Sequence, residues 1–398
     1  MTPSSTTSSP KSSSTTSLES EDDAGAFDPD ANHPWTHRPY CPEDGIPYCV
    51  HTSSSFRDDG VSFITIPFDR AMKTGEKTSI RFVEVLLAAE ALAQKEKTTA
   101  FSELAVEPKD KPYEVKDLSG KGKGVIATAH IPRGSVLMVE HAAVIADTLF
   151  PSKVKRVVGR EMLQRAMTRL GKDGEKAISE LARSSREQDQ VPAAEDLMRT
   201  NSFTVKIADK SHMALFPRVA RINHACQPSA ITRFDEKTLS MTVRAMKDIE
   251  PGEEITLSCK SPLNIDTDFG LSYHERQTTL KSKWGFDCTC SLCSATPSEI
   301  AASDARRDKI AKLGKVVIKH VENQDLKAAI KMHREMIDII EDEALAPHMG
   351  DYYEIMTRFL AATNDMKNAK KYARLALEEF KAAGETKDEL EQFLKAAK

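Results

Sequence analysis

The spacing of hydrophobic positions changes along the chain, and each change marks a different kind of structure. From Tyr113 the chain consists of short β-like runs broken by glycine and proline, beginning with YEVKDL, GVIATAHI and SVLMVE. The same texture returns after residue 200 in NSFTVKI, LSMTVRAMKDI and EEITLSC. Between these two groups, residues 151–199 have the amphipathic spacing of helices. The pattern predicts an α+β protein in which a helical subdomain is inserted into a β domain.

The residues before the β domain divide into a polar tail and an irregular lead-in. Residues 1–30 are rich in serine and threonine and then acidic, so they bury too little apolar surface to fold, and we expect a disordered tail. Residues 31–112 contain one clear helix, near residues 79–97, which we expect to pack against the β domain. The hydrophobic face of this helix consists of Phe82, Val85, Leu86 and Ala89.

Past Cys293 the hydrophobic spacing is helical to the last residue. The run DLKAAIKMHREMIDIIE matches DMKNAKKYARLALEEFK at an offset of forty, and Ala329 corresponds to Ala369. Small residues at recurring inner positions indicate paired helices like those of tetratricopeptide (TPR) arrays, although the usual period is about 34 residues. A plain helical bundle is the alternative for residues 298–398.

Composition excludes several classes of protein. The 398 residues are 40% hydrophobic, enough for two or three cores, and the net charge of -4 without a Lys/Arg-rich block disfavours direct nucleic-acid binding. No run of 18 apolar residues and no signal peptide is present, so we expect no membrane span and a location in the nucleus or cytoplasm. We also expect a monomer. In such a reducing compartment we expect Cys41 and Cys49 to be free structural or surface thiols.

Three cysteines in the stretch WGFDCTCSLC have the spacing of metal ligands. Cys288, Cys290 and Cys293 lie within six positions, and a tetrahedral zinc site needs a fourth ligand. Cys226, in RINHACQPSA, is the expected fourth ligand, and its neighbour His224 is the alternative. A site with four thiolates is structural, because no coordination position remains for water or substrate.

The motifs GKGKG, NSF, RINHACQPSA, GEEITLS and CTCSLC, taken together and in this order, resemble the SET-domain lysine methyltransferases. The helical insertion and the helical C-terminal region are similar to the SMYD-type and fungal branch, and the insertion holds no cysteine for a MYND zinc finger. The resemblance implies a SET domain over residues 113–262. A zinc-binding post-SET segment over residues 263–297 and the TPR-like region then follow.

The resemblance also implies a chemistry and a set of residues. Such enzymes transfer a methyl group from S-adenosylmethionine to a protein lysine, and they align donor and amine rather than supply a strong base. The aromatic Phe286 is expected to stack on the adenine, and Trp284 to line the lysine channel. The C-terminal helices are a possible surface for a protein partner. The residues expected to contact the cofactor are Gly122, Lys123, Gly124, Asn201, Asn223 and His224.

Two positions depart from the family pattern. The tyrosine that usually follows GEEITLS, next to the transferred methyl group, is Cys259, and the asparagine that usually closes NHxCxPN is Ser229. A second alignment puts Asp266 at the tyrosine position, and Tyr273 is the nearest tyrosine in the sequence. A thiol is a poor hydrogen-bond donor and lacks the ring that would wall the channel. The alternative function is therefore a catalytically impaired SET fold that acts as a binding or scaffolding module.

Overall fold

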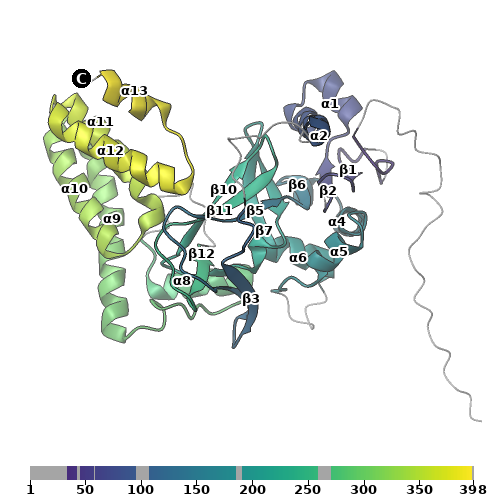
Figure 1. Cartoon of the computed structure of the whole chain (residues 1–398), viewed down its shortest axis with the longest axis horizontal. Coiled ribbons are helices and arrows are strands. Elements are labelled where there is room, and N and C mark those ends of the chain that lie inside the picture. Colours follow the sequence, from purple (N-terminus) through teal and green to yellow (C-terminus); the bar gives the residue numbers. More distant parts are fainter. Residues whose placement is uncertain are drawn as a thin grey trace, which may run out of the picture.

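The computed structural model describes residues 34–42, 45–57, 59–95, 107–184, 191–258 and 270–396. Its strands lie in the middle of the molecule, between the N-terminal helices on one side and the C-terminal helices on the other (Figure 1). None of the described helices is long and apolar enough to cross a membrane. The expected polar tail, residues 1–30, lies outside the described residues.

Twelve strands form three sheets in the described part of the chain. The first sheet has the order β1-β2-β6-β8-β7, the second β10-β11-β5, and the third β3-β4-β12-β9. Their bounds are β1 Cys49–Ser53, β2 Val61–Thr65, β3 Tyr113–Leu118, β4 Gly122–Ala127, β5 Val136–His141, β6 Val144–Asp147, β7 Ser202–Ile207, β8 Lys210–Leu215, β9 Asn223–His224, β10 Ala230–Asp235, β11 Ser240–Ala245 and β12 Glu254–Leu257.

The helices fall into three groups along the chain. Two precede the SET-like motifs, four form the insertion between β6 and β7, and the rest follow β12. Their bounds are α1 Phe68–Thr74, α2 Lys77–Lys95, α3 Phe150–Lys153, α4 Arg156–Thr168, α5 Lys172–Ser179, α6 Ala193–Asn201, α8 Tyr273–Trp284, α9 Pro297–Glu322, α10 Leu326–Asp342, α11 Met349–Ala362, α12 Met366–Ala383 and α13 Asp388–Ala396.

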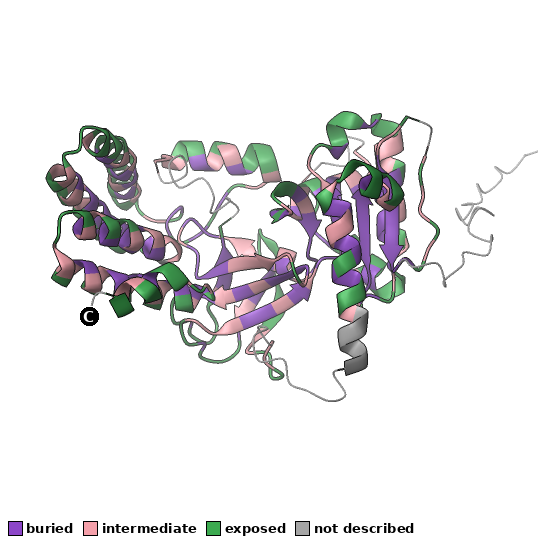
Figure 2. Ribbon diagram, turned by 90° about the horizontal axis from the view of Figure 1, so that it is seen from above, coloured by how far each residue is buried: buried purple, intermediate pink, exposed green. Residues whose placement is uncertain are grey.

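The predicted α+β arrangement and the helical insertion are confirmed. YEVKDL forms β3, and α4 to α6 cover most of residues 151–199. These helices pack through Met162, Ile178 and Leu197 onto the first sheet, and Figure 2 shows their buried faces. The helix predicted before the β domain is α2, and Phe82, Val85 and Leu86 are buried in the main core while Ala89 packs against it.

The lead-in is more regular than the sequence predicts, because it supplies β1 and β2 to the first sheet. Every residue of these two strands is buried. Strands covered on both faces show no alternation of polar and apolar positions. A hydrogen bond inside the protein compensates for part of this polarity, since the hydroxyls of Thr52 on β1 and Ser62 on β2 lie 2.8 Å apart.

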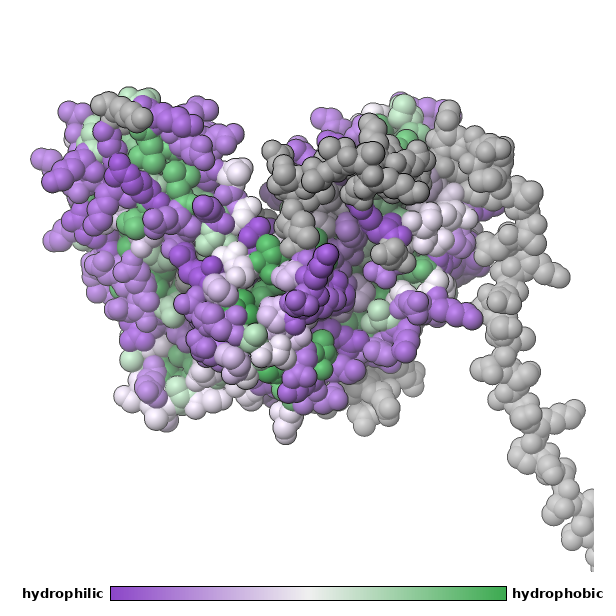
Figure 3. Space-filling view, viewed as in Figure 1, coloured by the Kyte–Doolittle hydropathy of each residue, from purple (hydrophilic) through white to green (hydrophobic). Residues whose placement is uncertain are grey.

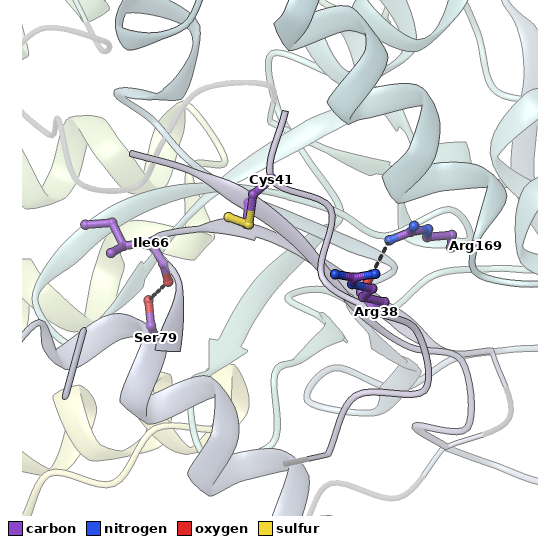
Figure 4. The surroundings of a disulfide bond; sticks show 6 residues. Arg38, Cys41, Ile66, Ser79 and Arg169 are labelled. Atoms are coloured by element: carbon purple, nitrogen blue, oxygen red, sulfur yellow. Dashed lines mark hydrogen bonds between the residues drawn. A yellow bond between two sulfur atoms is a disulfide. The ribbon is translucent and has the colours of Figure 1, made fainter. Parts of the chain in front are cut away.

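The prediction that Cys41 and Cys49 are free thiols is wrong, because the structure joins them in a disulfide. A β-bridge between Tyr40 and Val50 brings the two cysteines together. The strand pairing that makes this approach is long-range information that residue spacing does not contain. Neighbouring contacts fix the same region: Arg169 Nη1 donates to the Arg38 carbonyl at 3.0 Å, and Ser79 Oγ donates to the Ile66 carbonyl at 2.7 Å (Figure 4).

The forty-residue repeat is reproduced in the C-terminal helices. α10 and α12 begin with the same cap, in which the side chains of Asp325 and Asp365 accept hydrogen bonds from backbone N–H groups three residues later. Ala329 and Ala369 are both fully buried, so the small side chains let neighbouring helices approach closely. The outer surface of this region is mostly hydrophilic (Figure 3). Its classification as TPR-like stays a prediction.

A buried carboxylate fastens the C-terminal helices to the β domain. Glu343, at the end of α10, is fully buried and accepts hydrogen bonds from Ser303 Oγ at 2.7 Å and Arg307 Nε at 3.0 Å. Arg307 Nη2 in turn donates to the carbonyl of Cys226 at 3.0 Å. Gln227 Nε2 donates to the carbonyl of Glu343 at 2.9 Å. One network therefore connects α9, α10 and the loop that follows β9.

We expect the substitution Glu343→Ala to lower the free energy of unfolding by about 3 kcal/mol, because it leaves the buried Arg307 guanidinium without its counter-charge. Urea denaturation measures the change. Glu322→Ala removes a carboxylate from the exposed end of α9 and is the matched control. Equal stability of the two variants would contradict the role assigned to Glu343.

Candidate functional site

Four cysteine sulfurs form the compact centre of the candidate site. Cys226, directly after β9, and Cys288, Cys290 and Cys293, after α8, are all buried, and their sulfurs lie within 4.8 Å of one another. The sulfurs of Cys226 and Cys293 are 3.6 Å apart. Tetrahedral zinc, with Zn–S bonds of about 2.3 Å, places its sulfurs about 3.8 Å apart. The cluster therefore fits a four-thiolate metal site, with the ligands that the sequence predicts.

His224 lies beside this cluster and is not one of its four members. His224 Nε2 is 3.5 Å from the sulfur of Cys226, whereas the four sulfurs already complete a tetrahedral set. The structure thus groups Cys226, rather than His224, with Cys288, Cys290 and Cys293, and the identity of the fourth ligand stays a prediction. The imidazole of His224 also has the ring of Phe286 as a neighbour.

Two buried arginines lie close to the cysteine cluster. Arg276, on α8, is buried and donates to Asp304 Oδ1 at 2.9 Å. Burial alone would lower the pKa of its guanidinium, but the Cys226 thiolate and the Asp304 carboxylate raise it. Arg307 approaches from α9 through its bond to the Cys226 carbonyl. Each arginine is paired with a carboxylate, Arg276 with Asp304 and Arg307 with Glu343, so these two ion pairs hold the helices against the cluster without adding net charge.

The cysteines also influence one another. Hydrogen bonding with Cys288 is the largest cause that lowers the pKa of the Cys226 thiol, and Cys290 and Cys293 add to it. The same contact raises the pKa of Cys288. Four adjacent thiols cannot all ionise in the absence of a cation, because each thiolate raises the free energy of ionising its neighbours. A metal ion that neutralises the repulsion would allow all four to act as thiolates.

The glycine-rich hairpin meets the Asn223 strand next to this cluster. β3 and β4 form a hairpin in which Leu118 pairs with Gly122, so only the first part of GKGKG is a turn and the rest belongs to β4. A Cβ at Gly124 would lie 2.4 Å from Leu118 Cδ1 and 2.8 Å from Asn223 Nδ2. Only glycine fits at this position. The two motifs that the resemblance assigns to the cofactor are thus in contact.

Glu254 is a site residue that the sequence analysis does not single out. Its Oε1 accepts a hydrogen bond from Asn223 Nδ2 at 2.9 Å, and its Oε2 accepts one from Lys121 Nζ at 2.8 Å. β12 runs parallel to β9 with Thr256 beside Asn223, which puts the residue two positions earlier on the same face. Glu254 therefore links the glycine hairpin to Asn223 and fixes which way the Asn223 amide points.

Aromatic residues of the post-SET segment lie over the His224 side of the cluster. The rings of His224 and Phe286 are 6.2 Å apart, centroid to centroid. Trp284 and Tyr273 also pack against the cysteine cluster, and both are partly buried. The helix α8 ends at Gly285, which has a positive φ of 79° and lets the chain turn back toward His224. Metal ligands and aromatic side chains are thus carried by one short segment.

Asn201 lies at the end of α6, where the insertion meets the first sheet. Its amide Nδ2 donates to the carbonyls of Ala182 and Leu197, both at 2.8 Å. Two residues beyond Ala182, the backbone of Ser184 is so close to Gly285 that a Cβ there would lie 2.8 Å from the Ser184 carbonyl oxygen. The insertion therefore touches the segment that carries Phe286. Asn201 serves this packing through its amide hydrogens, which leaves its side-chain oxygen outside these bonds.

The remaining sequence-predicted positions have different outcomes. Lys123 lies on β4, exposed and opposite Asp117. Ser229 is buried, and its hydroxyl accepts the backbone N–H of Thr256 at 2.9 Å, so the serine holds the loop to β12. Cys259 lies outside the described residues, as does Asp266. The structure accordingly brings together the cofactor-side motifs and the cysteine cluster.

Comparison with known proteins matches residues 122–260 to the SET domain. The histone-lysine N-methyltransferase set5 of Schizosaccharomyces pombe is 28% identical over 235 residues, 58% of this chain and 66% of that protein. The N-lysine methyltransferase SMYD2 of Gallus gallus is 34% identical over 115 residues, and that of Homo sapiens 31% identical over 109, each covering 23% of the relative. The chain thus matches less than two thirds of the length of these relatives.

We expect the substitution Cys290→Ser to release the bound metal, because a hydroxyl is a much weaker ligand than a thiolate. Elemental analysis of purified protein should fall from one zinc per chain to well below half, with a lower melting temperature. Ser291→Ala, between two of the cysteines, is the control and should keep the metal. Cys226→Ser tests the fourth ligand in the same way, and full metal content in either cysteine variant would refute the site.

We expect the substitution Glu254→Gln to weaken S-adenosylmethionine binding about tenfold, because it breaks the link between Lys121 and Asn223 and frees the Asn223 amide to turn. Isothermal titration calorimetry measures the affinity. Glu253→Gln, at the exposed neighbouring position, is the matched control. If both variants bind the cofactor equally well, Glu254 does not position Asn223.

Proposed function

The chain belongs to the SET-domain lysine methyltransferase family, and on that premise we propose that it transfers a methyl group from S-adenosylmethionine to a lysine side chain of a protein. The observation that carries the proposal is the meeting of Gly124, Asn223 and Glu254 beside the His224 and Phe286 rings. These residues come from segments far apart in the sequence. A purely structural domain would have no need to assemble this set.

The cofactor would supply an electrophilic methyl group, and the chain's residues would hold and orient it. Gly122 leaves the backbone of β4 open to a close approach, because the space beside it is empty, whereas Gly124 makes room for Leu118 and Asn223. The amide of Asn223, directed by Glu254, and the imidazole of His224 offer polar contacts. Phe286 offers an aromatic face for the adenine. Asn201 and Lys123 complete the proposed set, Asn201 through its side-chain oxygen.

The lysine amine would be aligned and stripped of water rather than activated by a strong base. In-line displacement depends on placing the amine behind the methyl group at close range, which a narrow apolar channel achieves. Trp284, partly buried against the cysteine cluster, is proposed to form part of that channel. The sequence has Cys259 in place of the usual channel tyrosine. The rate of methyl transfer would therefore depend more on how the channel walls align the lysine amine.

The zinc ion is proposed to be structural. Four thiolates leave no coordination position for substrate, and their role would be to hold the segment with Trp284 and Phe286 over the Asn223 loop. Loss of the metal would free this segment, so it would affect cofactor binding without taking part in methyl transfer.

The substrate is proposed to be a histone or another protein lysine. The relatives are histone-lysine and N-lysine methyltransferases, and by their names they share the transfer of a methyl group to a lysine side chain. The C-terminal helices are proposed as a contact surface for a protein partner. A monomer located in the nucleus or cytoplasm remains the expectation from the sequence.

The proposal is tested by transfer of a labelled methyl group to a pool of histones and cytosolic proteins. We expect incorporation by the natural protein and at least a tenfold loss in Asn223→Ala, since the asparagine is placed at the cofactor. Asn323→Ala, at the exposed end of α9, is the matched control and should keep full activity.

The variant Cys259→Tyr decides between the proposed activity and the scaffolding alternative. Under the proposal the natural protein is active, and the added phenol changes its rate only moderately. If the natural protein binds S-adenosylmethionine without methylating any protein, and Cys259→Tyr alone is active, the chain is a binding module. That result would overturn the proposed function.

A further inference from the structure

A buried carboxylate binds the start of the segment that leads to Asn223. Glu140, on β5, is 7% exposed. Its two oxygens accept the backbone N–H of Arg218 at 2.7 and 3.0 Å, and Oε2 also accepts that of Val219 at 2.8 Å. These N–H groups lie at the start of the short 3₁₀ helix η3, Val219–Arg221, which ends two positions before Asn223. Glu140 thus fixes, from a separate strand, the point at which this segment begins.

Glu140 is an unfavourable residue with which to cap a helix. A carboxylate loses its hydration when it is buried, and no lysine or arginine side chain among the described residues forms an ion pair with this one. Burial raises the pKa of Glu140 to about 7, although the N–H groups of Arg218 and Val219 lower it. Serine, threonine, asparagine or aspartate usually cap such N–H groups. A buried glutamate at this place therefore indicates that the position of the segment matters for function.

The chain between η3 and β9 transmits the position of Val219 to Asn223. The N–H of Ile222 donates to the Val219 carbonyl at 3.0 Å, and both side chains are buried in the main core. β9 consists only of Asn223 and His224, which pair with two residues of β12. Because so short a strand forms few bonds of its own, its direction also depends on the chain that precedes it.

The side chain of Arg218 provides a second anchor. Its guanidinium pairs with Glu107, and Nη2 donates to the hydroxyl oxygen of Tyr113 at 3.1 Å. Tyr113 begins β3, the strand that pairs with β4 in the glycine hairpin. Glu107 Oε2 in turn accepts the N–H of Val139, on β5, at 3.4 Å. Arg218 therefore joins β5 and the glycine hairpin to the segment that begins with η3.

We propose that Glu140 is a positioning residue for methyl transfer, which holds the start of η3 so that Asn223 and His224 are directed to the S-adenosylmethionine site. This role rests on the proposed function, since it concerns the same site. Glu140 acts through the backbone of Arg218 and Val219 rather than through contact with the cofactor. Its loss therefore weakens cofactor binding, whereas the rate of methyl transfer at saturating cofactor is preserved.

The test compares the natural chain with Glu140→Gln at a pH of about 8, where the carboxylate is mostly ionised. The amide has only one acceptor oxygen, and its NH₂ group faces one of the two backbone N–H groups. We expect S-adenosylmethionine to bind about tenfold more weakly to the variant in isothermal titration calorimetry. In the assay with labelled methyl groups, KM for the cofactor should rise by a similar factor, while kcat changes by less than about twofold.

Further variants separate positioning from general charge and from loss of folding. Glu250→Gln changes an exposed glutamate beside His130 and should keep full affinity for the cofactor. Glu140→Asp keeps the charge with a shorter reach, so its affinity should lie between those of Glu140→Gln and the natural chain. Glu107→Gln, at the second anchor, should weaken binding about threefold. Melting temperatures show whether each variant is folded, and Glu107→Gln decides the question if Glu140→Gln is not.

Two results would overturn the role of Glu140. The first is equal cofactor affinity of the natural chain and Glu140→Gln or, where that variant is unfolded, of the natural chain and Glu107→Gln. The second is a fall in kcat as large as the fall in affinity, which would show a general effect on the fold.

Hydrogen exchange distinguishes the failure of this role from the failure of the proposed function. If the natural chain binds no S-adenosylmethionine, the proposed function fails. The backbone amides of residues 218–226 should still exchange faster in Glu140→Gln than in the natural chain without cofactor, whereas Glu250→Gln should leave their exchange unchanged. Equal exchange in all three proteins would overturn the positioning by Glu140.

Discussion

The approach of Cys226 to the CTCSLC cysteines is the contact on which the site depends. It joins a loop in the β domain to a segment more than sixty residues later, and the rings of His224 and Phe286 meet as a consequence. The same segment is also held by the packing of Leu280 and by the hydrogen bond from Arg276 to Asp304. Two buried ion pairs, Arg276 with Asp304 and Arg307 with Glu343, hold the neighbouring helices against the same cluster.

Much of this arrangement could be predicted because the metal ligands and glycine motifs have fixed spacings. The three cysteines of CTCSLC, the hairpin before Gly124 and the caps at Asp325 and Asp365 all follow from local sequence, whereas Cys226 was predicted from its place in the RINHACQPSA motif. Residues whose partners are distant in the chain could not be predicted in this way. Glu254 is one glutamate of a pair in GEEITLS, and only the parallel pairing of β12 with β9 distinguishes it from Glu253.

The strands that the sequence missed have a common physical cause. β1 and β2 are covered on both faces, so His51, Thr52 and Ser62 occupy interior positions that a polar residue normally avoids. The hydroxyls of Thr52 and Ser62 lie 2.8 Å apart across the sheet, and the ring of His51 packs against that of Trp35. The disulfide of Cys41 was missed for a related reason, because strand pairing rather than spacing brings its partner close. Long-range pairing is the information that a hydrophobic pattern lacks.

The bond from Arg307 to the Cys226 carbonyl makes the C-terminal helices part of the same cooperative unit as the cysteine cluster. A displacement of α9 would change the free energy of the loop that carries Cys226. By thermodynamic linkage, a metal bound to the cluster would stabilise the position of α9 by the same amount. A protein that binds these helices would therefore alter the affinity of the cysteine cluster for metal. The helical region would then report on the metal state of the site as well as supporting it.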